Sequence, residues 1–493
     1  MNMDTASHWP QALPSLKVCQ AARKSRDPRF DGRFFIGVAT TGIYCRTTCP
    51  ARMPLEENVR YFVTAAQAQE QAFRPCMRCR PEAAQRLPEW TLSSDTVLRA
   101  LRHIEAGYLN HQPTAALAGE LGVGERQLNR LFQCELGASP KTIASLCRAK
   151  LAKKLLLETP LKFTEVAFHA GYGSISRFNS EIKKSFQRTP REIRGGKVVS
   201  VGNTISVNLP VREPYDAQWM FDYLDKRSLV GLERVTSSER GWLYERKLPG
   251  KEQHWLAVRH HEGQLTAQLP LGDEPLHSLL SRVRCVFDLN ADGETIHQSL
   301  RGDATLGKWV GQRPGLRVPG AWDGFETAVR AILGQQVSVV RGTDLAAKMI
   351  DLYGEGFFPS PEQLEDKDVA EIGMPGKRGE AIRRLAAGVA AGDIKIGECE
   401  PYDELQEALE DLPGIGPWTA NYVRMRALKD PDAFPDNDWV VMKALDCNAK
   451  SAKAKAEAWR PWRAYALMYL WHASPEMRAA QQTTPRNKQM KKG

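Results

Sequence analysis

Two closely spaced pairs of cysteines near the N-terminus limit the fold of this chain more than any other feature. Three residues separate Cys45 from Cys49, two separate Cys76 from Cys79, and 26 lie between the pairs. Loops of this length let each pair chelate one ion, and two such pairs supply the tetrahedral set of four thiolates that zinc accepts. The spacing therefore predicts one zinc ion with four cysteine ligands, which holds together a domain too small to support itself.

The length of the chain, 493 residues, exceeds what one hydrophobic core can organise. A prior of roughly 150 residues per domain predicts about three or four modules. The ten cysteines are scattered through a chain without secretory features, so we expect reduced thiols rather than disulfides. No apolar run approaches the ~20 residues that span a bilayer, and we expect a cytoplasmic protein with no membrane partner.

Charge is distributed unevenly along the chain. The first 200 residues contain 30 Lys and Arg against 17 Asp and Glu, whereas the remaining 293 residues contain 38 against 41. A basic half attached to a nearly neutral half is typical of proteins that bind a polyanion. We therefore expect nucleic acid to be bound mainly by the first half.

The residues around the two cysteine pairs carry a resemblance. The run "TTGIYCRTTCPAR", then "EENVRYF", then "FRPCMRCRPE" resembles the N-terminal zinc domain of the Ada family of adaptive-response proteins, over about residues 10–85. The resemblance implies that Cys45 accepts the methyl group of a methyl phosphotriester in DNA, while Cys49, Cys76 and Cys79 complete the zinc shell. Zinc would keep the sulfur deprotonated and nucleophilic. The spacing alone leaves a purely structural zinc site as the alternative.

The same resemblance places further residues against the DNA backbone, where guanidinium groups suit phosphate oxygens. They are Thr41, Arg52, Arg74 and Arg78. The alternative is that they are solvated polar groups on a small domain. Methylation of one sulfur would remove one negative charge beside the DNA, so repair would act as a signal.

Hydrophobic residues recur with helical period from about Asp95 to Arg194. Within this segment "AALAGELGVGERQLNRLF" and "FTEVAFHAGYGSISRFNSEIKKSF" each predict a helix, a glycine-bearing turn and a second helix. The two in tandem resemble the AraC-family DNA-binding domain. That resemblance implies that the second helix of each unit enters a major groove, with Arg126, Arg130 and Arg177 among the contacting candidates. Phosphate contact or plain solvent exposure is the alternative for each of them.

After "RGGKVVSVGN" (194–203), which has the composition of a linker, the pattern changes. Segments such as "ISVNLPV", "GWLYERKL" and "HWLAVRHH" alternate apolar and polar residues and predict an α+β module without evident chemistry. From about residue 316 helical periodicity returns, and "LPGIGPWTA" interrupts it at Leu412. Backbone N–H groups around Gly414 and Gly416 would be free to bind a phosphate, although a plain interhelical turn is the alternative.

The run from "PGAWDGFETAVRAILGQQVSV" to "RPWRAYALMYLW", with "AFPDNDWVVMKAL" between, resembles the helix-hairpin-helix DNA glycosylases of the AlkA type. The resemblance implies that Asp438 is the catalytic carboxylate, which stabilises positive charge on the sugar as the N-glycosidic bond breaks. A mere helix cap is the alternative for Asp438. Trp418, Tyr422 and Trp471 occupy the positions of the base pocket, where aromatic faces attract a flipped cationic base. Core packing is the alternative for these aromatics.

Two positions depart from related patterns. Relatives that also cut the strand carry a lysine in the hairpin where this chain has Trp418, so we expect hydrolysis without lyase activity. AlkA places a leucine where this chain has Gln336, at the position of the wedge that fills the gap left by the flipped base. An amide can hydrogen-bond the orphaned partner base instead of stacking, which leaves the wedge mechanics and the base preference open.

Taken as a whole, the sequence predicts a multidomain, mainly α protein that resembles a fusion of the two families. The expected segments are a small zinc-bound α+β domain (1–86), an all-α tandem helix-turn-helix domain (90–196), a TBP-like α+β domain (203–308), an all-α glycosylase domain (312–480) and a disordered basic tail (481–493).

The expected function is excision of alkylated bases such as 3-methyladenine, combined with a methyl-sensing transcriptional activator. The alternative is a transcription regulator whose inactive glycosylase half only binds DNA. The expected partners are alkylated and promoter double-stranded DNA and RNA polymerase, for a monomer at the bacterial nucleoid. The motif "PCHRV" of the second Ada methyl acceptor is absent, so reversal of methylguanine damage is not expected.

Overall fold

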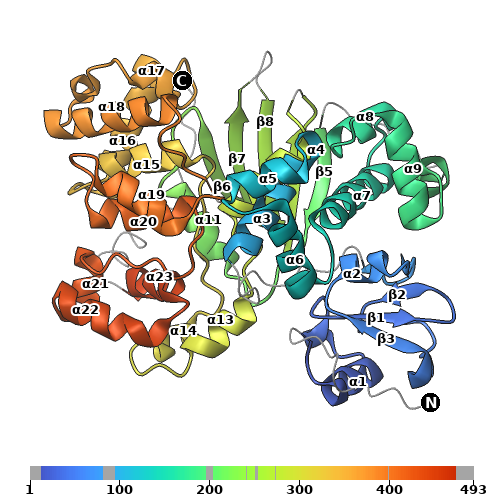
Figure 1. The fold of residues 1–493 in the computed structure, drawn as a ribbon. Helices are drawn as coiled ribbons and strands as arrows, with labels where there is room; N and C mark the ends of the chain where they lie inside the picture. The colour runs from blue at the N-terminus through green and yellow to red at the C-terminus, as the bar shows by residue number, and fades with distance from the viewer. Residues whose placement is uncertain are drawn as a thin grey trace. The chain divides into compact units, whose positions relative to one another are not determined.

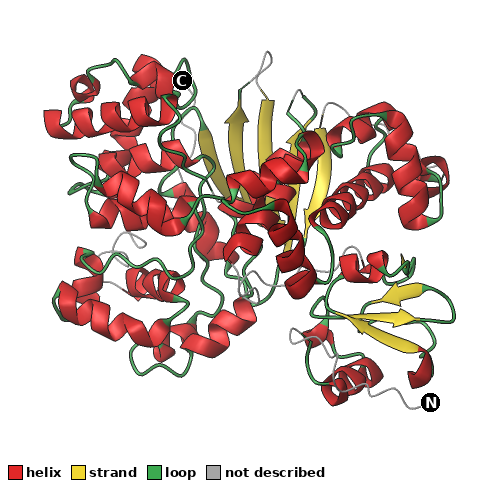
Figure 2. Cartoon of the chain, in the orientation of Figure 1, coloured by secondary structure: helices red, strands yellow, loops and turns green. Residues whose placement is uncertain are grey.

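The computed structural model describes residues 13–81, 95–195, 204–239, 241–249, 254–272, 274–397 and 399–473. Contacts divide the chain into two compact units, Met1–Val207 with Gln268–Ser281, and Asn208–Ala267 with Arg282–Gly493. Helices predominate in the described residues, and strands gather in two sheets (Figures 1 and 2). The predicted tail and most of the predicted linker lie outside the described residues. No helix of the described part combines the length and the apolar character that crossing a membrane requires.

The N-terminal module is a four-stranded sheet of order β3-β1-β2-β4 with one helix on each face. Strand β1 pairs antiparallel with β2 and β3, and β2 pairs parallel with β4. The elements are α1 (Leu16–Ser25), η1 (Pro28–Phe30), β1 (Phe35–Val38), β2 (Ile43–Cys45), η2 (Glu56–Asn58), β3 (Val59–Phe62), α2 (Ala65–Glu70) and β4 (Arg74–Pro75).

The core of this module is split by the sheet into two small clusters. Phe35 packs with Phe62 and other residues on the face of α2, and its neighbour Ile36 packs with Cys19 of α1 on the opposite face, as the alternation along a strand dictates. Gly37 has no room for a side chain, because a Cβ there would lie 2.4 Å from the Phe62 ring. Cores of this size support little stability by themselves, which fits a domain held by a metal.

Residues 95–194 form a purely helical segment. Its elements are α3 (Asp95–Glu105), α4 (Tyr108–His111), α5 (Thr114–Glu120), α6 (Glu125–Leu136), α7 (Pro140–Glu158), α8 (Phe163–His169), α9 (Ile175–Phe186) and α10 (Pro190–Arg194). The pairs α5–α6 and α8–α9 are the two helix-turn-helix units, and α7 contacts α3, α9 and α10. Gly122 and Gly171 end the first helix of each pair with φ of 68° and 84°, a conformation that favours glycine. Ser139 and Ser174 cap α7 and α9 by accepting backbone N–H bonds.

A five-stranded sheet of order β5-β9-β8-β7-β6 follows. Its strands are β5 (Thr204–Leu209), β6 (Glu233–Ser238), β7 (Gly241–Leu248), β8 (His254–His261) and β9 (Gln264–Pro270). β7 pairs antiparallel with both β6 and β8, and Tyr244 lies opposite Val235 and Val258. Helix α11 (Ala217–Asp225) packs against β6 and β7 and buries Trp219 and Tyr223. Strands and a helix thus pack together in this part of the chain.

The remaining helices build the C-terminal half. They are α12 (Leu276–Val286), α13 (Gly293–Leu300), α14 (Gly307–Gln312), α15 (Gly324–Leu333), α16 (Val339–Tyr353), α17 (Pro361–Leu364), η5 (Val369–Ile372), α18 (Gly376–Ala390), α19 (Tyr402–Glu410), α20 (Pro417–Ala427), α21 (Trp439–Ala444), α22 (Ala449–Ala456), η6 (Glu457–Trp459) and α23 (Arg463–Ala473).

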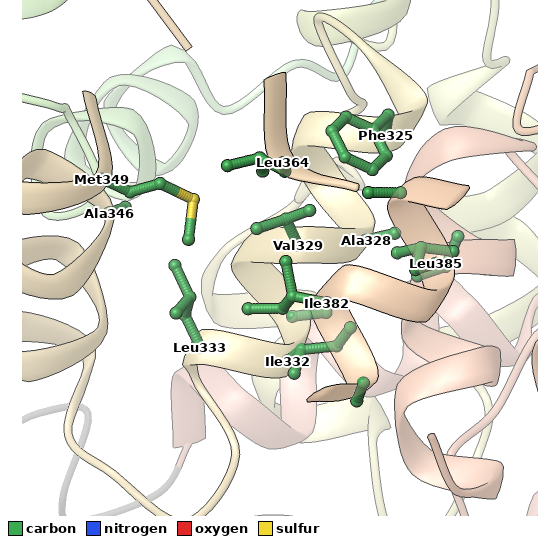
Figure 3. Packing of buried hydrophobic residues seen from close by; sticks show 14 of the residues in the cluster. Phe325, Ala328, Val329, Ile332, Leu333, Ala346, Met349, Leu364, Ile382 and Leu385 are labelled. Atoms are coloured by element: carbon green, nitrogen blue, oxygen red, sulfur yellow. The ribbon is translucent and has the colours of Figure 1, made fainter. Parts of the chain in front are cut away.

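Helix α15 lies within a core of buried hydrophobic residues in this half. Figure 3 shows Val329 and Ile332 of α15 beside Ile382 and Leu385 of α18, with Met349 of α16 on the other side. α15 also packs against α20. A helix that is buried on nearly every side is a rigid support, and Gln336 lies in the loop that follows its C-terminal end.

Candidate functional site

The four predicted zinc ligands come together. The sulfur atoms of Cys45, Cys49, Cys76 and Cys79 all lie within 4.8 Å of one another, and those of Cys49 and Cys76 are 3.9 Å apart. A tetrahedral zinc with Zn–S bonds of ~2.3 Å requires sulfur atoms about 3.8 Å apart. The donor set and its spacing therefore fit zinc, and the prediction of one ion held by four cysteines is confirmed.

Strand pairing explains how two distant loops meet. Cys45 is the last residue of β2, and Cys76 directly follows β4, which runs parallel to β2. The Cys76 N–H donates to the Tyr44 carbonyl at 3.0 Å, so one ligand from each pair is fixed by the sheet. The backbone N–H of Arg46 donates to the Cys79 sulfur at 3.4 Å, which favours the thiolate form of that sulfur.

Without a cation, the cluster does not hold several thiolates at once. A hydrogen bond from Cys45, which outweighs burial, lowers the pKa of Cys79 to about 6. The pKa of Cys45 is raised far above its ordinary value by that same hydrogen bond to Cys79, and next by burial and the neighbouring sulfurs. Burial raises the pKa of Cys49 to about 11. A dication at the centre of the cluster would remove this repulsion.

The residues predicted to contact the DNA backbone lie around this cluster. Thr41, Arg52 and Arg78 are exposed, and Arg74 is half-buried in β4. Arg46, by contrast, forms a bidentate ion pair with Asp31 and is held in the fold. The three exposed side chains are available to a ligand.

In the helix-turn-helix units, the predicted arginines stand on the second helices. Arg126 and Arg130 are exposed on α6. Arg177 is exposed on α9 but donates from Nε to Glu181 at 2.8 Å, one turn further along the helix. The ion pair with Glu181 fixes the orientation of the Arg177 guanidinium, and the other two nitrogens of that group can bind a ligand.

The interhelical hairpin lies between α19 and α20. Ile415 is buried and anchors it, while Gly414 is exposed with φ of 95°. Within the described residues, the N–H groups of Gly414 and Gly416 donate to no other group. Two free amides at the start of a helix suit a phosphate oxygen.

Gln336 occupies the loop between α15 and α16. It is exposed with φ of 53°, a left-handed conformation that is uncommon for any residue but glycine. Its neighbour Gln335 donates from Nε2 to the Gly414 carbonyl and to Thr419 Oγ1, both at 3.0 Å. Gln335 therefore ties the loop that carries Gln336 to the hairpin. Gln335 was not among the residues predicted from the sequence, where the adjacent "QQ" pair was its only signal.

Asp438 is the N-cap of α21 and also the acceptor of two indole N–H groups. Its Oδ1 accepts from the Val441 backbone N–H at 2.9 Å and from Trp471 Nε1 at 3.4 Å. Its Oδ2 accepts from Trp418 Nε1 at 2.7 Å. The side chain is 6% exposed. Asp438 is thus a helix cap, as the alternative interpretation held. The cap uses only Oδ1, and Oδ2 accepts a hydrogen bond from a tryptophan instead.

The three predicted aromatic residues form one group. The rings of Trp418 and Tyr422 stack with centroids 5.3 Å apart and an interplanar angle of 19°. The rings of Tyr422 and Trp471 are 6.4 Å apart and tilted by 33°. The tryptophans were predicted to offer their ring faces to a base, and in the structure their indole N–H groups also donate to the Asp438 carboxylate.

Two further residues at this site were missed. Arg426, one turn after Tyr422 on α20, donates from the same nitrogen to the hydroxyls of Tyr422, at 2.7 Å, and Tyr223. The hydroxyls of Tyr223 and Tyr422 are 3.2 Å apart. The i, i+4 spacing of Trp418, Tyr422 and Arg426 was visible in the sequence, but nothing in it pointed to Tyr223.

Three domain families match successive parts of the chain. The metal binding domain of Ada matches residues 18–82, a helix-turn-helix domain matches residues 117–196, and the AlkA N-terminal domain matches residues 206–323. DNA-3-methyladenine glycosylase 2 of Escherichia coli is 33% identical over 52% of this chain and 94% of its own length. The bifunctional transcriptional activator/DNA repair enzyme Ada of the same organism is 32% identical over 35% of this chain and 47% of its own length.

One relative spans nearly the whole chain. It is the probable bifunctional transcriptional activator/DNA repair enzyme AlkA of Mycobacterium tuberculosis, 36% identical over 92% of this chain and 95% of its own length. A match of this extent includes residues of the zinc module, the helix-turn-helix segment and the glycosylase half. The chain belongs to the family of Ada–AlkA fusion proteins.

Proposed function

We propose that this protein excises alkylated bases such as 3-methyladenine from DNA and also senses DNA methylation to activate transcription. The observation that carries the first activity is the buried carboxylate of Asp438, which accepts hydrogen bonds from Trp418 and Trp471 beside the ring of Tyr422. A carboxylate that receives several hydrogen bonds is held in a fixed orientation. The relatives named for DNA repair and DNA-3-methyladenine glycosylase activity support this proposal.

The flipped base would lie between Tyr422 and Trp471. Their rings are 6.4 Å apart, and a base sandwiched between two rings needs about 7 Å, twice a stacking distance of ~3.5 Å. A small opening of this gap therefore suffices. The base would rest there by aromatic contact on both faces.

The reaction breaks the bond between C1′ of the sugar and the base nitrogen. The bonding electrons leave with the base, so a cationic alkylated base departs neutral and positive charge develops on C1′. The carboxylate of Asp438 stabilises that charge. Water then forms the new C1′–O bond, and its proton passes through the carboxylate to solvent. Trp418 offers no amine for a Schiff base, so we expect hydrolysis without strand cleavage.

The second activity would take place at Cys45. The sulfur attacks the methyl carbon of a methyl phosphotriester, the carbon–oxygen bond breaks, and the DNA phosphate leaves as an anionic diester. Bound zinc would supply the charge that keeps the sulfur deprotonated. The cluster of one zinc and four thiolates carries a charge of about −2, and methylation reduces it to about −1. The less negative module then binds DNA more tightly.

Promoter binding would follow from the tandem helix-turn-helix units, with Arg126, Arg130 and Arg177 at the DNA and Thr41, Arg52, Arg74 and Arg78 at the backbone near the zinc. The hairpin amides of Gly414 and Gly416 would hold a phosphate beside the damaged base, and Gln336 would fill the gap. Activation further implies contact with RNA polymerase, and we expect the protein to act as a monomer in the bacterial cytoplasm.

One incubation tests both activities. DNA carrying radiolabelled methyl groups is mixed with the protein, and freed bases and protein-bound label are measured. We expect Asp438→Asn to abolish base release and Cys45→Ser to abolish labelling, each without affecting the other. Asp436→Asn and the exposed-cysteine variant Cys134→Ser are matched controls. Absence of base release from the unchanged protein would favour the alternative, a regulator with an inactive glycosylase half, and absence of label would leave a structural zinc site.

A further inference from the structure

Tyr422 also lines a second hollow, toward which its hydroxyl accepts a hydrogen bond from Arg426. This hollow has a volume of about 60 Å³ and is lined among others by Tyr223, Arg227, Arg246, Arg330, Tyr422 and Arg426. A cavity of this size holds about two water molecules, too little for a base. The hollow therefore influences the base pocket through electrostatics rather than by binding the base, because four of the side chains that line the hollow are guanidinium groups.

The positive groups around this cavity are not equally neutralised. Arg246 and Arg330 both form ion pairs with the carboxylates of Glu233 and Glu326. Arg426 is 8% exposed and, within the described part of the chain, forms no ion pair with a carboxylate. Its partners are the hydroxyls of Tyr422 and Tyr223 and the carbonyl of Gly320.

The charge of Arg426 disfavours the binding of a cationic base beside Tyr422. Aromatic rings attract a cationic base through their faces, but the Arg426 guanidinium carbon lies 5.4 Å from the centre of the Tyr422 ring. A positive charge so close repels a second positive charge that stacks on the same ring. A neutral damaged base does not experience that repulsion.

We propose that Arg426 is a specificity-determining residue that, through the hydroxyl of Tyr422, biases the base pocket against cationic N-alkylpurines and toward neutral damaged bases. The proposal rests on the proposed glycosylase function of the same pocket. Loss of the Tyr422 proton cancels the bias, because the phenolate and the guanidinium then form a neutral pair. The preference for cationic bases thus increases with pH.

The surroundings of Tyr422 support this ionisation. Burial alone would raise the pKa of Tyr422, but Arg426 first, and then Arg227, the hydrogen bond from Tyr223, and Arg330, lower it to about 8. The other charged or titratable groups around the cavity are Glu233, Tyr244, Arg246 and Glu326, and Asp438 lies beyond Trp418. The pKa of Tyr223 is raised by its own burial, so Tyr422 is the phenol that ionises.

The test measures competition between two lesions in duplex DNA, the cationic 3-methyladenine and the neutral 1,N6-ethenoadenine, with spontaneous loss subtracted. The ratio of their kcat/KM values, cationic over neutral, is followed from about pH 6.5 to about pH 9. We expect the ratio to rise about tenfold in the unchanged protein, with a midpoint near 8. In Tyr422→Phe the ratio stays at the low-pH value throughout. Tyr244→Phe is the matched control, a second buried tyrosine of the same cavity whose pKa is raised well above its ordinary value, and it keeps the rise.

A second measurement does not depend on the variant folding correctly. The near-ultraviolet absorbance of tyrosinate in the unchanged protein should show one phenol that ionises with a midpoint near 8. A pH-independent ratio in the unchanged protein, or an equal rise in Tyr422→Phe, overturns the proposal. Failure to release either base at any pH counts against the glycosylase function itself, so the two failures are distinguishable.

Discussion

The zinc cluster and the Asp438 site hold their reactive groups by opposite means. The Cys45 sulfur is one of four sulfurs within 4.8 Å, and the four come from two short loops with two cysteines each. Three N–H groups hold the Asp438 carboxylate, one from the first turn of α21 and two from tryptophans of α20 and α23. One site uses an ion to organise a small core, and the other uses a large core to orient one carboxylate.

The difference matches the use of each group. A sulfur that accepts a methyl group in a thioether bond is consumed, so its domain has to react once and then signal. A carboxylate that stabilises charge is regenerated, and rigid support improves every turnover. The aromatic residues around Asp438 come from α20 and α23, both packed into the interior of the glycosylase half.

Removal of the metal should affect one region and not the other, and this is the largest effect we expect. Structural zinc sites contribute about 10–16 kcal/mol of folding free energy, far more than the two small clusters of the N-terminal module. Treatment with a chelator should abolish amide exchange protection of β1 and β3, measured by hydrogen exchange with mass spectrometry. Protection of α15 and base release should not change. Persistent protection of β1 in metal-free protein would show that the comparison is wrong.

Substitution of Asp438 should separate its two roles. Asp438→Asn and Asp438→Ala should each lower kcat on the order of 10³-fold, because the charge is lost in both. Only alanine removes the cap on the Val441 N–H, which costs about 1 kcal/mol and shifts thermal unfolding by about 2–4 °C. Activity assays and thermal melts of both variants check this. Equal melting temperatures would mean that the cap contributes nothing.

The zinc centre could be predicted from the sequence because each pair of ligands lies within a few residues of chain. The two short loops contain the ligands, and the number and type of residues determine the metal. The four cysteines do gather as expected, and the β2–β4 pairing adds only how they meet.

The glycosylase site could be predicted only in outline. Family resemblance gave Asp438 and the three aromatics, but their hydrogen bonds join residues 20 and 33 positions apart. The bond from Arg426 to Tyr223 spans 203 positions, and the tie from Gln335 to Thr419 spans 84. Periodicity describes one element at a time, so it contains no information on which side chains meet across elements.

Loss of either indole N–H group should lower kcat less than loss of the carboxylate, but by a measurable factor. Trp418→Phe removes a 2.7 Å bond to Asp438, and a hydrogen bond to a charged group contributes about 1.5–3 kcal/mol, so kcat should fall about 10- to 100-fold. Trp471→Phe removes a 3.4 Å bond and should cost less. The phenyl ring keeps the aromatic contact, so KM should change little. Trp309→Phe, on α14, is the control, and an equal loss of kcat there would indicate a general effect on folding.

The smallest expected effect concerns the tie between the Gln336 loop and the hairpin. Gln335→Ala removes bonds to the Gly414 carbonyl and Thr419 Oγ1, worth about 0.5–1.5 kcal/mol each, so kcat/KM on damaged duplex should fall about 3- to 10-fold. The exposed Gln298→Ala is a matched control.

A double-mutant cycle with Thr419→Val decides whether the tie itself is responsible for that loss. Since both variants remove one shared bond, their combined effect should be smaller than the sum of the single effects, by about 0.5–1.5 kcal/mol. Strictly additive effects would show that the two residues act independently. In that case the loop with Gln336 and the phosphate-binding hairpin would move separately, and Gln336 would reach the gap left by the base without help from the hairpin.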